Sequence, residues 1–152
     1  MSVSFFRSLA ALLCCTIGLS AQTDDKKGPV LTFEETDFNL GVFDKEDAVH
    51  SHYFVFTNTG DENLVISDAY GSCSCTTVSE CPRYPIAPGA SDSIKVMYDG
   101  TTRRPGVFRR VVTLVFNSKI EEDRVVRVTI TGEMVDTKPR SEQDNTSSSA
   151  EH

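Results

Sequence analysis

The chain of 152 residues contains no tryptophan, and no apolar run in it reaches the roughly 20 residues that a membrane-spanning helix needs. It also lacks a glycine-rich phosphate loop, a serine nucleophile elbow and the paired-histidine helix of zinc proteases. No two cysteines lie on well-separated predicted strands, so an antibody-type core with its disulfide between sheets is excluded. Because no catalytic constellation is recognisable, we predict a protein without enzymatic activity and without a cofactor.

Basic residues are also scarce. Lysine and arginine number 15 against 22 aspartates and glutamates, which gives a formal net charge of −7. An acidic surface is repelled by the phosphates of nucleic acids and by anionic lipid headgroups. We therefore expect neither a nucleic acid nor an anionic membrane surface as a partner.

The first 21 residues have the pattern of a cleaved signal peptide. Arg7 supplies the positive charge, residues 8–19 are mostly apolar but too few to span a bilayer, and a serine and an alanine follow. We expect cleavage before Gln22 and no lipid attachment, since neither Cys14 nor Cys15 follows a suitably small residue. The pattern predicts export to the periplasm, the cell surface or the medium, with no transmembrane segment in the mature chain.

The apolar residues of the remaining chain are confined to one segment. Residues 22–29 form a polar spacer, and residues 30–135 hold almost all of the valine, isoleucine, leucine and phenylalanine. Residues 136–152 are rich in serine, threonine and acidic side chains, so they cannot bury enough surface to offset the entropy of ordering. We predict one folded domain over residues 30–135, followed by a disordered tail over residues 136–152.

Within that domain the apolar residues repeat with a period of two. Examples are the alternating apolar sets Ile94, Val96 and Tyr98, then Val112, Leu114 and Phe116, then Val126, Val128 and Ile130. Clusters of glycine, proline, asparagine and aspartate separate these runs, and residues 30–33 add an edge strand. The pattern predicts an all-β fold, an immunoglobulin-like antiparallel β-sandwich of about seven strands.

Three cysteines remain after the predicted cleavage, and all lie close together. Cys73 and Cys75 occupy a turn between two strand-like runs, and Cys81 follows within the same predicted loop. A bond between Cys73 and Cys75 would close a very small, strained ring, so we predict one disulfide that joins Cys81 to either of the other two. Two alternatives stay open: thiolates that bind Cu(I) or Zn, and half-buried thiols that only pack the end of the sandwich.

Two further groups of side chains are weaker candidates. His50 and His52 share one face of a strand, as two metal ligands would, although solvated residues near the rim have the same pattern. The pairs at 103–104 and 109–110 are all arginine. These arginines either hold an anionic group of a partner, such as a carboxylate or a sugar acid, or protect turns and edge strands against pairing.

Residues 73–85 form the longest predicted connection, and long loops on rigid sandwiches often carry recognition. Tyr84 offers contact area at low entropic cost, and Arg83 adds a charge beside it. We therefore predict that Arg83 and Tyr84 form a binding loop.

Several short motifs, taken in order, resemble one known family. They are Gly41-Val42-Phe43, Phe54-Val55-Phe56-Thr57-Asn58-Thr59-Gly60, Leu64-Val65-Ile66, Ser72-Cys73-Ser74-Cys75-Thr76, Pro85-Ile86-Ala87-Pro88-Gly89, Ile94-Lys95-Val96-Met97-Tyr98-Asp99, Gly106-Val107-Phe108 and Ile130-Thr131-Gly132-Glu133. Together they look like the bacterial domain-of-unknown-function 1573 family, from about Leu31 to Val135. The resemblance implies an exported immunoglobulin-like domain and brings no general activity with it.

These features favour a non-catalytic binding or assembly module that works outside the cytoplasm, with an envelope protein or a glycan as its partner. The alternative is a thiol-redox or metal-handling protein that uses Cys73, Cys75 and Cys81. An enzyme whose site cannot be recognised in one sequence is a third class.

Overall fold

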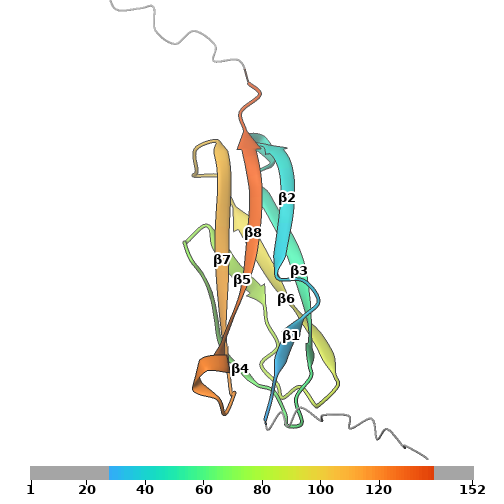
Figure 1. Ribbon diagram of the computed structural model, residues 1–152. Helices are drawn as coiled ribbons and strands as arrows, with labels where there is room; N and C mark the ends of the chain where they lie inside the picture. The colour runs from blue at the N-terminus through green and yellow to red at the C-terminus, as the bar shows by residue number, and fades with distance from the viewer. Residues whose placement is uncertain (1–27, 139–152) are drawn as a thin grey trace, which may run out of the picture.

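The computed structural model describes residues 28–138 (Figure 1). The predicted signal peptide, residues 22–27 of the polar spacer and residues 139–152 of the predicted tail lie outside these residues. Export, cleavage before Gln22 and disorder of the tail therefore stay predictions.

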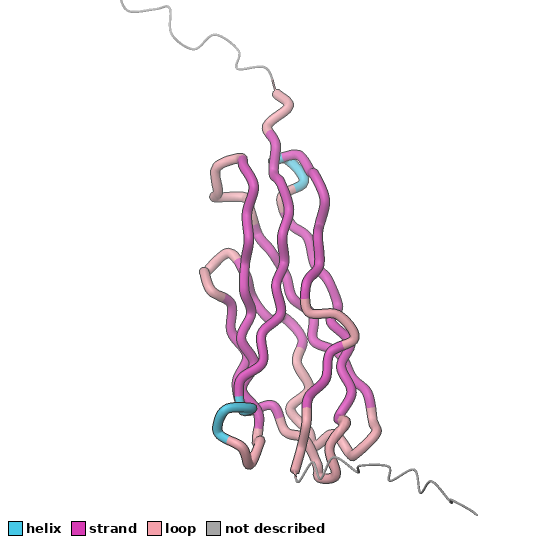
Figure 2. Tube along the Cα trace, in the orientation of Figure 1, coloured by secondary structure: helices cyan, strands magenta, loops and turns pink. Residues whose placement is uncertain are grey.

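Eight strands form two sheets that pack face to face, and the only helical segments drawn in Figure 2 are two short turns. The strands are β1 (Leu31–Phe33), β2 (Asp37–Asp44), β3 (Val49–Asn58), β4 (Ile66–Gly71), β5 (Thr76–Glu80), β6 (Ser91–Asp99), β7 (Gly106–Phe116) and β8 (Val125–Val135), and the short 3₁₀ turns are η1 (Lys45–Asp47) and η2 (Glu121–Arg124). The first sheet has the order β1-β3-β6-β5, and the second sheet has the order β2-β8-β7-β4. The predicted immunoglobulin-like β-sandwich is confirmed.

The start of the domain differs from the prediction in two respects. Where we expected a single edge strand, the chain forms β1 on the first sheet and then crosses to the second sheet as β2. β2 runs parallel to β8, so the second sheet is mixed and not purely antiparallel. The residues around Gly41, which resemble a turn in the sequence, lie inside β2, where the register shifts between Asn39 and Val42 and Gly41 has a φ of 79°.

The core lies between the two sheets and uses the side chains that the period of two predicts. Fully buried residues come from both sheets: Phe54, Phe56, Ile94, Val96, Tyr98, Val112, Leu114, Val128 and Ile130. Burial of each of these side chains stabilises the fold by about 1.5–3 kcal/mol. Val126, which the same pattern places in the core, is only half-buried, because it lies beside a pocket.

The buried amide of Asn58 fixes the end of the sandwich from which β1 begins. Its Nδ2 donates to the carbonyl oxygens of Glu62 and Ile86, at 2.7 and 2.9 Å. Its Oδ1 accepts from the backbone N–H groups of Val30 and Gly60. All the hydrogen-bonding capacity of the amide is therefore used, and the chain that leads into β1 is held in place.

The ordered chain continues past the predicted boundary at residue 135. The backbone N–H of Thr137 donates to Asp44 Oδ2 at 3.0 Å, and its hydroxyl donates to the same oxygen. Lys138 pairs with Glu46 in η1. The hydrogen bonds to Asp44 hold the pKa of that carboxyl below its ordinary value.

Candidate functional site

The turn between β4 and β5 carries a disulfide between Cys73 and Cys75, whose Cα atoms lie 5.2 Å apart. The position of both cysteines in a turn between two strands agrees with the prediction from the sequence. Cys75 is buried, with 4% of its surface exposed, whereas Cys73 is half-buried. The two cysteines therefore differ in their exposure to solvent.

The predicted pairing of Cys81 is wrong. The segment read as one loop contains the strand β5, and five extended residues, which rise about 3.3 Å each, carry Cys81 roughly 16 Å along the sandwich. Cys81 is a free, half-buried cysteine beyond the end of β5. Burial raises the pKa of its thiol above the ordinary value.

The backbone of the cysteine turn is held from several sides. The N–H of Ser72 donates to the carbonyl of Val111 on β7, and the N–H of Asp99 on β6 donates to the carbonyl of Cys75. At Gly71, a Cβ atom would lie 2.0 Å from the carbonyl oxygen of Thr76, so no side chain fits there. The turn is therefore fixed by main-chain contacts in addition to the disulfide.

Two of the four predicted patch arginines converge on this turn. Arg110 Nε lies 3.3 Å from Cys75 Sγ, and Arg103 donates from Nη2 to Ser74 Oγ at 3.1 Å. Arg109 points to the other face of β7, where it contacts Asp37 and Thr129. β4 pairs with β7 only from Val112 to Phe116, so at Arg109 and Arg110 β7 has a partner strand on the β8 side alone, and protection of a strand edge stays an interpretation of these two arginines.

The two histidines face the inside of the sandwich and are not solvated rim residues. The ring of His52 stacks on Phe38 with 3.5 Å between centroids, and its Nε2 lies 2.7 Å from Glu35 Oε1. His50 packs against Phe43 with 4.1 Å between ring centroids. Across residues 28–138, no three histidine, cysteine, aspartate or glutamate side chains gather as a metal site would require.

The predicted binding-loop residues follow β5 and lie on the surface. Tyr84 is 60% exposed, and its hydroxyl donates to Asp92. Arg83 donates from Nη1 to the carbonyl of Ser67 at 3.3 Å. The hydrogen bond to Asp92 raises the pKa of the Tyr84 phenol. The loop is shorter than expected, because β5 takes up its first part.

Sequence reasoning missed an open edge on β8. β7 pairs with β8 from Val125 onward, but β2 pairs with it only from Thr129 onward. The first four residues of β8, Val125 to Val128, therefore have no strand on the β2 side within the part of the chain that is described. No pattern in the sequence marks this feature, because it depends on where β1 ends and β2 begins to pair.

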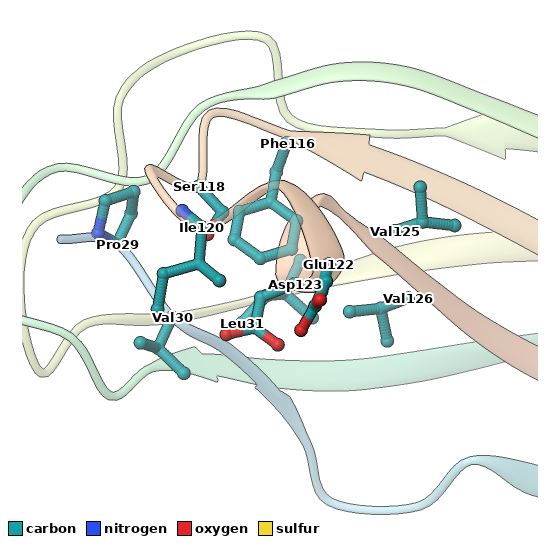
Figure 3. A pocket seen from close by; sticks show the side chains of 10 residues that line it. All are labelled: Pro29, Val30, Leu31, Phe116, Ser118, Ile120, Glu122, Asp123, Val125 and Val126. Carbon is teal, nitrogen blue, oxygen red and sulfur yellow. The ribbon is translucent and has the colours of Figure 1, made fainter. Parts of the chain in front are cut away.

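A pocket of 330 Å³ lies beside this open edge (Figure 3). Leu31, Phe116, Ile120, Val125 and Val126 give it an apolar lining, and Pro29, Val30, Ser118, Glu122 and Asp123 complete its wall. The lining residues come from the chain entering β1 on one side and from the β7–β8 connection and β8 on the other. The pocket is thus the gap that remains where the edges of the two sheets are not joined.

Comparisons with solved structures reveal the same fold in otherwise dissimilar proteins. A protein of unknown function from Porphyromonas gingivalis W83 aligns with a TM-score of 0.60 and 16% identity, over 76% of this chain and 51% of its own. The Vibrio cholerae VesB protease aligns with a TM-score of 0.52 and 19% identity, over 68% of this chain and 31% of its own. The PapD-like domain 7 of human CEP192 aligns with a TM-score of 0.52 and 9% identity, over 91% of this chain and 99% of its own.

At these identities the likeness concerns the fold alone. The chain spans about half of the Porphyromonas protein and about a third of VesB. A search of curated proteins finds no match. No helix within residues 28–138 is long and apolar enough to cross a membrane. A family model described as "Protein of unknown function (DUF1573)" matches residues 31–134, which is more than half of the chain, and the protein therefore belongs to the DUF1573 family.

Proposed function

We propose that this protein is a non-catalytic binding module that works outside the cytoplasm and captures an extended segment of an envelope protein at the open edge of β8. The observation that carries the proposal is the pairing of β8. Its first four residues lack a neighbour on the β2 side within residues 28–138, directly beside an apolar pocket. An unpaired strand edge is a template for a further strand.

The geometry at this edge favours a polypeptide over a glycan. A segment that lies along Val125 to Val128 finds main-chain donors and acceptors spaced for a β-ladder. Side chains on such a strand alternate, so one of them points toward the pocket. A pocket of 330 Å³ is at the lower end of the range for ligand sites, about 300–1,000 Å³, which suits an apolar side chain of the captured segment.

Charge at the pocket specifies the partner further. Glu122 and Asp123 line it, and neither forms an ion pair with another residue of the described range 28–138. A lysine or arginine that flanks the apolar side chain of the partner would meet these two carboxylates. The favoured ligand is therefore an extended segment with one large aliphatic residue next to a basic residue.

A synthetic peptide array tests this function. Extended peptides that combine an aliphatic anchor with a neighbouring lysine should bind, and the same peptides with proline at alternate positions should not, because proline cannot donate to a ladder. Substitution of Ile120, whose surface is 53% exposed, by serine should weaken binding about tenfold or more. The matched control is Val107→Ser, at a residue that is 81% exposed and does not line this pocket.

The same array distinguishes the edge from the predicted loop. Replacement of Arg83 and Tyr84 by alanine should leave peptide binding unchanged if β8 is the site. Loss of binding in that double variant, with Ile120→Ser unaffected, would move the interface to the loop and contradict the proposal.

The alternative function retains one supporting observation. That alternative is a thiol-redox or metal-handling protein, and the contact of Arg110 with Cys75 favours the thiol-redox role. The metal-handling role has no comparable support, because two of the three thiols that would bind the metal are joined in a disulfide.

A further inference from the structure

Arg110 lies where a negative charge would be stabilised. It is half-buried on the inner side of β7, and no carboxylate of residues 28–138 pairs with it. Its Nε points at Cys75 Sγ, and its Nη1 donates to the carbonyl of Arg109. A disulfide sulfur is a weak acceptor, whereas a thiolate is a strong one. The cation is thus placed for a charge that only the reduced form of Cys75 carries.

Other groups around the turn favour the same state. Thr76 Oγ1 lies 3.6 Å from Cys73 Sγ and 3.8 Å from Cys75 Sγ, so its hydroxyl can donate to either sulfur. Arg103 brings a second guanidinium to the turn through Ser74. Arg103 Nε is buried and has no hydrogen-bond partner. Cations next to a cysteine lower its thiol pKa and increase the share of thiolate.

The unequal burial of the two cysteines favours attack on one of them. A nucleophile reaches the half-buried Cys73 more easily than Cys75, which is 4% exposed. Attack on one sulfur of a disulfide expels the other as a thiolate. Attack on Cys73 therefore releases Cys75 directly beside Arg110.

We propose that the Cys73–Cys75 disulfide is a redox-active site that accepts two electrons from a dithiol, with Cys73 as the attacked sulfur and Cys75 as the leaving thiolate held by Arg110. A thiolate of the dithiol bonds to Cys73 Sγ, and the bond between Cys73 and Cys75 breaks. The second thiol of the dithiol, after losing its proton, then displaces the Cys73 thiolate. The dithiol leaves as a disulfide, and both cysteines of the turn are reduced. This inference does not rest on strand capture at β8.

The backbone of the turn has contacts that do not depend on the disulfide, so it should keep its conformation when the disulfide is reduced. Its main chain is bonded to Val111 on β7 and to Asp99 on β6, and none of these contacts uses a sulfur atom. Cys81 takes no part, because β5 separates it from the pair. The exchange is therefore confined to two sulfurs in a fixed backbone.

Equilibration with reduced and oxidised dithiothreitol tests the role of Arg110. In the full chain carrying Cys14→Ser, Cys15→Ser and Cys81→Ser, Arg110→Gln should make the disulfide about tenfold harder to reduce, which corresponds to about 30 mV for two electrons. The pH at which the reduced pair is half-alkylated should rise in the same variant, and Arg110→Lys should restore part of both effects. Arg109→Gln removes the same charge on the other face of β7 and should change neither.

If the equilibrium constants for reduction of Arg110→Gln and Arg109→Gln agree within twofold, the proposed role of Arg110 is wrong. Circular dichroism of the reduced protein should match that of the oxidised protein; unfolding on reduction would show a purely structural disulfide and also overturn the proposal. Reaction with reduced glutathione, acid quenching and peptide mapping should locate the glutathione on Cys73 and the freed thiol on Cys75. The reverse location would refute the assigned direction of attack.

Discussion

The cysteine turn and the open edge of β8 differ in how far their main-chain groups are hydrogen-bonded to neighbouring strands. The turn between β4 and β5 has main-chain hydrogen bonds to β6 and β7, a disulfide and a glycine that accepts no side chain. The first four residues of β8 have a partner strand on one side only and lie beside a pocket. A region that is closed in this way can change its covalent state without changing its shape, whereas an open edge can accept another chain.

A methyl group at Gly71 should break the closed region. Gly71→Ala places a Cβ atom 2.0 Å from the Thr76 carbonyl oxygen, and both residues belong to the backbone that holds the turn. We expect a loss of about 3 kcal/mol in the free energy of unfolding, measured by urea denaturation. Val125→Ala, at the mouth of the open edge, should cost less than about 1 kcal/mol, because Val125 is 37% exposed. Similar losses in the two variants would remove the contrast between the regions.

Removal of the disulfide should show how much of the closed region depends on it. In the chain-entropy model, a ring of three residues contributes about 1.5 kcal/mol. Replacement of Cys73 and Cys75 by serine should therefore lower the free energy of unfolding by less than Gly71→Ala does, with the strand content unchanged by circular dichroism. A larger loss would mean that the sulfurs, and not the main-chain bonds, hold the turn.

The strands and the core could be predicted because alternation is a local pattern. Ile94, Val96 and Tyr98 are buried where the period of two places them, and the cysteines lie in the expected turn. The predicted disulfide pairing is wrong because Thr76 to Glu80 forms a strand and not a loop, and so short a strand between polar residues has no clear alternation in the sequence. The interpretation of His52 as a solvated rim residue is also wrong. Its ring faces inward against Phe38, and this contact depends on β2 crossing to the other sheet.

The pairing partners of β8 could not be predicted in the same way. The alternation of Val126, Val128 and Ile130 indicates a strand but not which neighbours it has along its length. The open edge exists because β2 begins to pair only at Asp37, after the chain has left β1. Register between distant segments decides this, and register is set by tertiary packing.

The smallest effect on stability is expected just beyond the C-terminal end of β8, where the chain is held by hydrogen bonds that its N-terminal end lacks. There Thr137 donates its hydroxyl and its N–H to Asp44, and the hydrogen bonds lower the pKa of this carboxyl in the folded protein. A lowered pKa means that this stabilisation is present above the ordinary pKa of aspartate and is lost as the pH falls through the folded value. Thr137→Val should therefore lower the melting temperature slightly at neutral pH and not at all in strong acid. Because Asp44 is only half-buried and water screens its charge, the difference at neutral pH should be small, and a difference that persists unchanged in acid would show that Asp44 is not the partner that matters.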